Sequence, residues 1–146
     1  MNSPADIIPS ELCYHGAGAE VMLAYQNERI RDSVAELAQT LGQIPLFQCD
    51  VTNDDEVIDL FKQIGALHGT LSIVVHSIAY ANREDLGGEF SKTDRAGFRV
   101  AIEVSAFSLL PIIRHASPLM TNGGNVIAMT FLASERVFPG YNVMGT

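Results

Sequence analysis

The strongest strand signal in the chain is Leu71-Ser-Ile-Val-Val-His76. This stretch is short, rich in β-branched residues and bounded by turn residues, which is typical of a buried strand. The next residues, Ser77-Ile-Ala79, would therefore follow the end of a strand. Ligands of open α/β sheets bind in the crevice beyond the carboxyl ends of the strands. We expect this segment to belong to a functional site.

Strand and helix signals alternate along the rest of the chain. Short apolar runs predict further strands at 20–25, 44–48 and 125–130. Helical spacing of apolar residues predicts helices at 28–41, from Thr52 or Asn53 to Gly65 or Gly69, and at 94–120. Strands that alternate with crossover helices predict a parallel sheet covered by helices on both faces.

The helix predicted at 94–120 is the longest in the chain. Pro111 is expected to kink this helix or to end it early, because proline lacks the amide proton that a helix needs. The helical periodicity predicts an inner face formed by Phe98, Ala101, Ile102, Ser105, Leu109, Ile112 and Ile113.

The fold class that these signals predict is α/β, a Rossmann-like doubly wound parallel sheet in one partial domain of residues 1–146. Such a domain opens with a strand and a glycine-rich turn before its first helix. Residues 5–15 have the pattern of that first helix, and Gly16 and Gly18 follow it, so we expect a helix C-cap here and no phosphate loop. The first strand with its glycine-rich loop and the C-terminal part are therefore expected to be missing.

Composition and charge limit the possible partners. The chain has 146 residues, of which 47% are hydrophobic and 18% are charged, as in an ordinary globular protein. Its net charge of -8 disfavours nucleic acid and anionic membranes as partners. No signal peptide and no apolar run of membrane-spanning length is evident, so we expect a cytoplasmic protein. Cys13 and Cys49 lack metal-ligand spacing and are expected to be free buried thiols, and no metal site is predicted.

Five segments together resemble the bacterial enoyl-acyl-carrier-protein reductases of fatty-acid synthesis, a branch of the short-chain dehydrogenase/reductase superfamily. They are Ala24-Tyr-Gln-Asn-Glu28, Gln48-Cys-Asp-Val51, Val75-His-Ser-Ile-Ala-Tyr-Ala81, Glu103-Val-Ser-Ala-Phe-Ser108 and Pro139-Gly-Tyr-Asn-Val-Met-Gly145. The resemblance runs from about Asp6 to Thr146 but covers only the middle part of a full-length enzyme, which implies an internal fragment.

The resemblance implies a binding site for NADH. Gln26 stands where NAD-binding domains usually carry an acidic residue for the ribose hydroxyls, and the family places it beside the adenosine end. A solvated polar residue at a strand end is the alternative interpretation of Gln26. The resemblance places the Asp50 carboxylate near the adenine amine and Val51 near the base. An N-cap or turn aspartate remains the alternative role for Asp50.

The segment after the strand at 71–76 would hold the other end of the cofactor. By the resemblance Ser77, Ile78 and Ala79 bind the cofactor, with Ile78 against the nicotinamide. A small residue at position 79 lets the cofactor approach the backbone closely. Ala81 would lie beside the acyl substrate, and His76 is expected to be a packed histidine at the strand end.

Tyr141 is the predicted catalytic residue, because the family's proton donor or oxyanion partner stands at this position of the motif. An ordinary tyrosine has a pKa of about 10, and the family pairs it with a lysine seven residues on, beyond Thr146. A merely packed tyrosine is the alternative. Phe131 stands where the family has a second tyrosine, so it can form a wall of the substrate pocket but cannot donate a hydrogen bond.

The predicted function is NADH-dependent reduction of trans-2-enoyl thioesters carried on acyl carrier protein. Full-length relatives are homotetramers in which the helix at 94–120 packs between subunits. One alternative is a short-chain dehydrogenase acting on a carbonyl, which is disfavoured by Ser105 and Ala128 at positions where such enzymes often carry asparagine and serine. The other is a non-catalytic truncated remnant, which the missing phosphate loop and lysine would favour.

Overall fold

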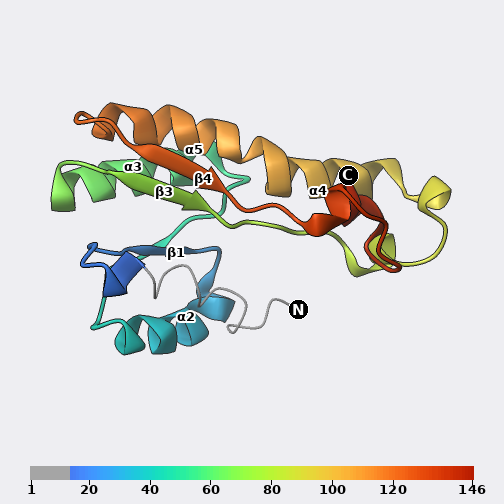
Figure 1. The fold of residues 1–146 in the computed structure, drawn as a ribbon, viewed down its shortest axis with the longest axis horizontal. Coiled ribbons are helices and arrows are strands. Elements are labelled where there is room, and N and C mark those ends of the chain that lie inside the picture. The colour runs from blue at the N-terminus through green and yellow to red at the C-terminus, as the bar shows by residue number, and fades with distance from the viewer. Residues whose placement is uncertain (1–13) are drawn as a thin grey trace. The chain divides into compact units, whose positions relative to one another are not determined.

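The computed structural model describes residues 14–146 (Figure 1). The chain divides after Lys62 into two compact units, residues 1–62 and 63–146. That both units belong to one domain stays a prediction. Cys13 and most of the helix predicted at 5–15 lie outside the described residues.

The first unit contains a parallel β-α-β arrangement. Strand β1 (Leu23–Tyr25) pairs in parallel with β2 (Leu46–Gln48), and helix α2 (Glu28–Thr40) connects them. The helix begins after Asn27, whose side-chain oxygen accepts a hydrogen bond from the amide of Arg29. Helix α3 (Asp54–His68) follows β2, and the boundary between the two units falls within it, after Lys62. The side chain of Asn53 accepts a hydrogen bond from the Asp55 amide at 3.1 Å. Both predicted strands of this unit are confirmed with shorter bounds.

The glycines before β1 cap the end of a helical turn. Tyr14 to Gly16 are helical, and Gly18 has the left-handed φ of 86° that L-residues other than glycine rarely adopt. The Gly18 amide donates to the His15 carbonyl at 2.9 Å, and the Ala19 amide donates to the Tyr14 carbonyl at 3.1 Å. This confirms the predicted C-cap.

The second unit is built on another parallel pair. Strand β3 (Ile73–His76) pairs with β4 (Asn125–Ala128), with Ile73 opposite Asn125 and His76 opposite Ala128. The Met129 amide donates to the His76 carbonyl at 2.9 Å and extends this ladder by one bond. The loop after β3 contains the 3-10 turns η2 (Arg83–Leu86) and η3 (Phe90–Lys92), and β4 is followed by η6 (Leu132–Ser134) and η7 (Asn142–Gly145).

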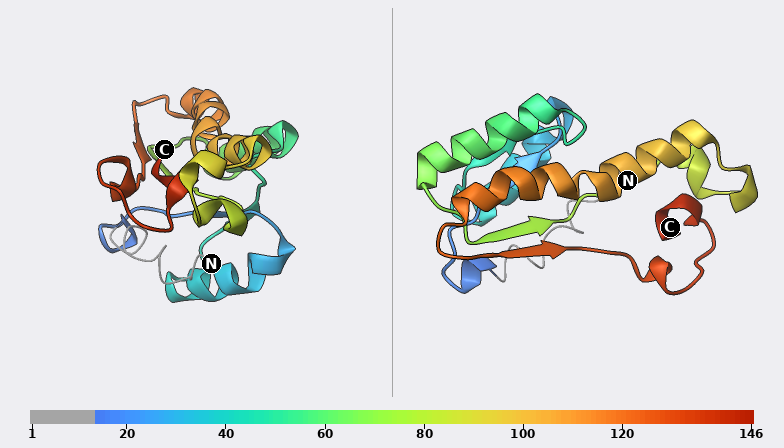
Figure 2. Two further views of the ribbon diagram at one scale, coloured as in Figure 1. Left: turned by 90° about the vertical axis from the view of Figure 1, so that its right-hand side faces the viewer. Right: turned by 90° about the horizontal axis from the view of Figure 1, so that it is seen from above.

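The helix predicted at 94–120 has three parts. They are α4 (Arg95–Ile102), a π-helical turn η4 (Glu103–Phe107) and α5 (Leu109–Ala116), with a final 3-10 turn η5 (Ser117–Leu119). Figures 1 and 2 show α4 and α5 as one nearly continuous rod that runs beside β3 and β4. The Asp94 side chain caps the start of α4 by accepting a hydrogen bond from the Ala96 amide.

The irregular turn lies before Pro111 and not at it. In η4 the Ser108 amide donates to the carbonyl of Glu103, five residues earlier, at 3.1 Å. A proline clashes with the carbonyl four residues before it, here that of Phe107, which is the last residue of η4. The prediction that Pro111 would kink or end the helix is therefore wrong in position, because α5 continues through Pro111 to Ala116.

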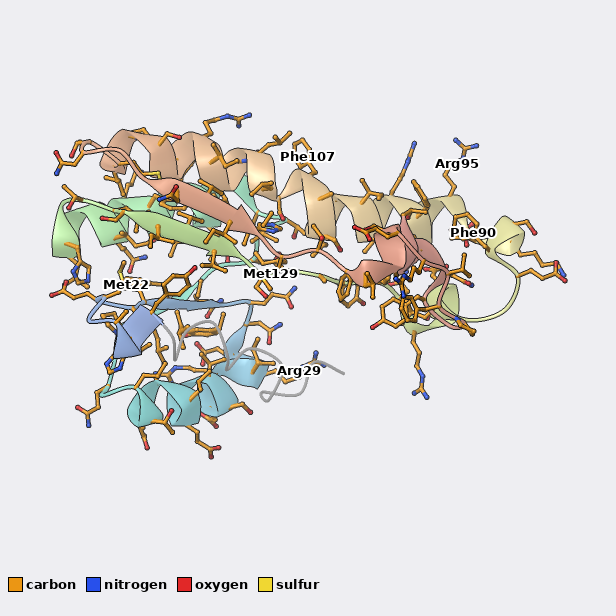
Figure 3. All side chains as sticks on the ribbon, viewed as in Figure 1. Met22, Arg29, Phe90, Arg95, Phe107 and Met129 are labelled. Atoms are coloured by element: carbon orange, nitrogen blue, oxygen red, sulfur yellow. The ribbon has the colours of Figure 1, made fainter. Side chains whose placement is uncertain are left out.

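One side of this rod is apolar and exposed. Ala101 and Ile112 of the predicted inner face are buried, but Phe98 is 40% exposed, so its inner placement is wrong. Phe107 is 53% exposed and points away from the strands (Figure 3). Within residues 14–146 the stretch Arg95–Leu119 is the one helix long and apolar enough to cross a membrane by length and composition, a test that core helices of soluble proteins also pass. The exclusion of membranes as partners stays a prediction.

The parallel pairings confirm the α/β class. Among the described strands β1 pairs only with β2, and β3 pairs only with β4. Each unit has its own buried residues: Leu37, Leu41 and Val57 in the first, and Ala101, Ile112, Ala116 and Val143 in the second.

Candidate functional site

The end of β3 is fixed by a buried hydrogen-bond chain. His76 is only 3% exposed, and its Nε2 lies 2.8 Å from the Ser108 hydroxyl oxygen. The Ser108 hydroxyl donates to the Val104 carbonyl at 2.7 Å, so it accepts from the protonated Nε2 of His76. Burial lowers the pKa of His76 below its usual 6.5, against an opposing backbone hydrogen bond. A neutral, packed histidine is therefore present, as predicted.

Beyond His76, the backbone is held again at Tyr80. The Tyr80 amide donates to the Ser105 hydroxyl oxygen at 3.0 Å, and the same hydroxyl donates to the Tyr80 carbonyl at 3.2 Å. Ser105 lies in the π-helical turn η4. The predicted cofactor-binding residues Ser77, Ile78 and Ala79 lie between the two fixed points.

A hollow of about 160 Å³ lies within the second unit, among the ends of β3 and β4, α4, η4 and η7. Met129, labelled in Figure 3, follows β4 and forms part of its wall. Ile78 and Phe131, both predicted site residues, line the hollow, whereas Ser77, Ala79, Ala81 and Tyr141 are not among its lining residues. The full lining is Ile78, Ala101, Ile102, Ser105, Met129, Thr130, Phe131, Val143, Met144 and Thr146.

Tyr141 lies in a cluster of aromatic rings. Its ring centroid is 5.9 Å from that of Phe131 in an edge-to-face arrangement and 6.0 Å from that of Phe138. The tyrosine is 41% exposed. The ring of Phe131 therefore contacts Tyr141 on the one hand and lines the hollow on the other.

The residue after Tyr141 ties this turn to the loop after β3. Asn142 has a left-handed φ of 33°, and its side-chain amide donates to the carbonyls of Gly87 at 2.8 Å and Gly88 at 3.3 Å. Asparagine tolerates this backbone region better than most residues other than glycine. Sequence reasoning assigned no role to Asn142, because a lone asparagine in a turn carries no visible sign of a long-range partner.

Asp85 is a second residue that the sequence reasoning missed. It is only 7% exposed, and its Oδ2 accepts a hydrogen bond from the Asn82 side chain at 3.1 Å. The carboxylate packs directly against Gly97, where any Cβ would overlap it. A glycine inside the predicted helix was the one available signal of this close approach.

The predicted cofactor residues of the first unit are linked to one another. The Gln26 side-chain amide donates to Asp50 Oδ2 at 3.0 Å, and Asp50 Oδ1 accepts from the Thr52 hydroxyl at 2.7 Å and amide at 2.9 Å. Burial raises the pKa of Asp50, but the bonds from Thr52 and Gln26 outweigh this and bring the pKa below its usual 3.8. Asp50 is therefore charged at neutral pH. Asn53 and not Asp50 caps α3, while Asp50 accepts hydrogen bonds within the turn; its role beside the adenosine end stays a prediction.

Val51 follows Asp50 in the same turn and is partly buried. Its neighbour Cys49 is 5% exposed and is a free cysteine. Burial, followed by the charges of Glu56 and Asp50, raises the pKa of the Cys49 thiol to about 11. The predicted free buried thiol is thus confirmed for Cys49. Within the described part of the chain, no group of three or more His, Cys, Asp or Glu residues could hold a metal ion.

The sequence profile described as enoyl-(acyl carrier protein) reductase matches residues 12–146. The chain belongs to this family. A Bacillus cereus relative, named enoyl-(acyl-carrier-protein) reductase (NADH) FabI, is 50% identical over 133 residues, which are 90% of this chain and 52% of that protein. The chain thus spans about half the length of the curated relatives it matches.

Solved structures of enoyl-(acyl carrier protein) reductases show the Rossmann-like α/β fold of this chain. The structure of the NADH enzyme from Aquifex aeolicus superposes with a TM-score of 0.88 at 34% identity, covering 92% of this chain and 54% of that one. The Bacillus cereus enzyme, solved with NADP+ and indole naphthyridinone, superposes with a TM-score of 0.85 at 49% identity. The matched region is 90% of this chain and 52% of the Bacillus cereus chain.

Proposed function

We propose that this chain carries the reductase chemistry of its family: reduction of a trans-2-enoyl thioester on acyl carrier protein, with NADH, in fatty-acid biosynthesis. One observation supports it most directly. The ring of Tyr141 packs edge-on against Phe131, and Phe131 together with Ile78 lines a hollow beyond the ends of two parallel strands. This is where α/β folds bind their ligands.

The residues present fit a nicotinamide cofactor. The backbone on either side of residues 77–79 is hydrogen-bonded, at His76 to the Met129 amide and at Tyr80 to the Ser105 hydroxyl, and the segment carries the small Ala79, so a planar ring could approach it closely. We assign Ser77, Ile78 and Ala79 to the nicotinamide end and Gln26, Asp50 and Val51 to the adenosine end. The cofactor, when bound, supplies the hydride that reduces the β-carbon.

The charge of Asp50 supports NADH as the preferred form of the cofactor. Its carboxylate is ionised and faces the Gln26 amide at the end of β1. Dinucleotide-binding folds read the ribose 2′-hydroxyl at this strand end, and NADPH carries a phosphate there. A fixed negative charge would repel that phosphate. We therefore expect tighter binding of NADH than of NADPH, measured by calorimetry with both.

Tyr141 is assigned the chemistry at the thioester. Its hydroxyl would donate a hydrogen bond to the thioester oxygen as charge develops there, and would provide the proton that completes the reduction. Phe131 and Ala81 would contact the acyl chain. The rings of Phe131 and Phe138 pack against the Tyr141 ring and limit the positions that its hydroxyl can take.

The test compares Tyr141→Phe with Tyr80→Phe. Tyr80 is also exposed, and its hydroxyl bonds only locally, to Asn82 at 3.3 Å. With a crotonyl thioester of acyl carrier protein, we expect Tyr141→Phe to lower kcat by about 100-fold or more, and Tyr80→Phe to change it little. The loss of NADH absorbance measures the rate.

Three outcomes would contradict the proposal. Equal rates in the Tyr141→Phe and Tyr80→Phe variants would show that the Tyr141 hydroxyl has no catalytic role. Reduction of a β-ketoacyl thioester in place of the enoyl thioester would favour a carbonyl-reducing short-chain dehydrogenase. Absence of both NADH binding and turnover would favour the non-catalytic remnant.

We further infer a cytoplasmic homotetramer for the full-length protein. The exposed apolar side of the α4–α5 rod supports an assembly contact, since Phe107 is 53% and Leu110 is 54% exposed. Monomeric soluble proteins rarely leave large apolar patches uncovered.

A further inference from the structure

The π-helical turn η4 directs two serine side chains towards the segment that follows β3. Ser105 lies within η4 and Ser108 directly follows it, and the contacts of both hydroxyls lie at this segment. Ser108 contacts His76 at the end of the strand, and Ser105 contacts the backbone of Tyr80. A single helical turn therefore fixes both ends of the segment 77–79.

The contact made by Ser105 is unusual because one hydroxyl satisfies both backbone groups of one residue. A hydroxyl has one proton to donate and two lone pairs to accept with. At Tyr80 it accepts from the amide at 3.0 Å and donates to the carbonyl at 3.2 Å. Past the last ladder bond at His76 the backbone has left the sheet, and Ser105 supplies the partners that a neighbouring strand supplies elsewhere.

The hollow described above adjoins this contact. Ile78 and Ser105 both line it, so the segment that Ser105 holds forms part of its wall. A shift of the backbone at Tyr80 would move Ile78 with it. In enzymes, a misplacement of about 1 Å at a remote residue can cost about 100-fold in rate.

We propose that Ser105 is a positioning residue, whose hydroxyl fixes the backbone of residues 77–80 so that the nicotinamide end of the cofactor meets a preformed surface. This rests on the proposed function. Ser105 does not touch the reacting atoms in this role. The contact reduces the conformational entropy that residues 77–80 lose when the cofactor binds.

The experiment uses three variants of the whole chain. Ser105→Ala removes both bonds, Ser105→Thr keeps the hydroxyl, and Ser117→Ala is the matched control, since the Ser117 hydroxyl bonds only to the Ile113 carbonyl of its own helix. Amide hydrogen exchange at Tyr80 reports the contact, and calorimetric titration with NADH reports its consequence. Circular dichroism establishes that each variant is folded.

We expect the Tyr80 amide of Ser105→Ala to exchange about tenfold faster or more, and its Kd for NADH to rise about tenfold. Ser105→Thr should restore both values, and Ser117→Ala should leave both unchanged. Faster exchange with an unaltered Kd would overturn the positioning role while leaving the proposed function intact. Unaltered exchange would overturn the contact itself. A wild-type chain that binds no NADH would overturn the proposed function and this inference together.

Discussion

At Gly97 the absence of a side chain makes room for a buried carboxylate. Asp85 packs onto the first turn of α4, and all its carboxyl atoms lie closer to a Cβ built at position 97 than van der Waals contact allows. Gly97→Ala should therefore destabilise the fold by about 1–3 kcal/mol, although alanine is the better helix former. Urea unfolding measures the difference.

The control for this prediction is Gly87→Ala. Gly87 has no atom within 4 Å of a built Cβ, and its φ of -120° suits any residue. Gly87→Ala should change the free energy of unfolding by no more than about 0.5 kcal/mol. If the double variant Gly97→Ala/Asp85→Ala loses as much stability as Gly97→Ala alone, overlap with the Asp85 carboxylate is not the cause of the loss.

His76 makes the stability of the fold depend on pH. Burial lowers the pKa of the folded state below the usual 6.5, so the unfolded chain binds the proton more readily. The stabilising difference is complete above pH 6.5 and is lost as the pH falls towards the folded-state pKa. Urea midpoints at pH 7.5 and 5.0 should show this decline. His76→Gln keeps a hydrogen-bond donor for Ser108 and should reduce the fall of the urea midpoint between pH 7.5 and 5.0. An unchanged fall in this variant would exclude His76 as its source.

Among the short elements, η7 depends on the side chain of Asn142. The backbone there is left-handed, and the side-chain amide bonds to two carbonyls of the loop after η2. Asn142→Ala loses the bonds and strains the backbone, so we expect a loss of about 2 kcal/mol. Asn142→Gly loses the bonds alone and should cost about 1 kcal/mol. Equal losses in thermal unfolding would show that the backbone conformation carries no strain.

The regular elements were predictable because their signals are local. The β-branched residues of β3 and the apolar spacing of α2 each specify one conformation from neighbouring residues alone. The π-helical turn was not predictable, since its apolar spacing resembles that of an α-helix. Pro111 signalled an irregularity, but the structure accommodates it in the preceding turn.

In the candidate site, too, some residues were predictable from the sequence and others were not. Family motifs identified Tyr141, Phe131 and Ile78, and the structure brings the first two rings together and places the last two in one hollow. The residues that hold these groups, such as Asp85 and Asn142, were missed because their partners are distant in sequence. Only the folded chain reveals such partners.

For the molecule as a whole, the exposed side of the α4–α5 rod predicts self-association. Phe107 and Leu110 are large, apolar and more than half exposed. If this side contacts another copy, Phe107→Glu combined with Leu110→Glu should shift the assembly to monomers, since charges at a buried contact are strongly unfavourable. Light scattering after size-exclusion chromatography measures the mass.

The matched control is Leu67→Glu, which charges an equally exposed leucine, 56% accessible, on α3. It should leave the mass unchanged. A wild-type chain that is already monomeric at micromolar concentration would contradict the prediction for this chain.

The π-helical turn at Glu103–Phe107 also determines how the chain would respond to the deletion of a residue. A π-helical turn contains one residue more than the α-helical turn that it replaces. Deleting Ala106 would let a regular helix run from Arg95 to Ala116, and simple helix formation would favour the shorter chain. Because the turn carries the extra residue, its removal would leave the helical segments on either side in their relative orientation and would change the turn alone. Ser105 lies within that turn, so a helix made more regular would lose the geometry by which the Ser105 hydroxyl reaches the Tyr80 backbone.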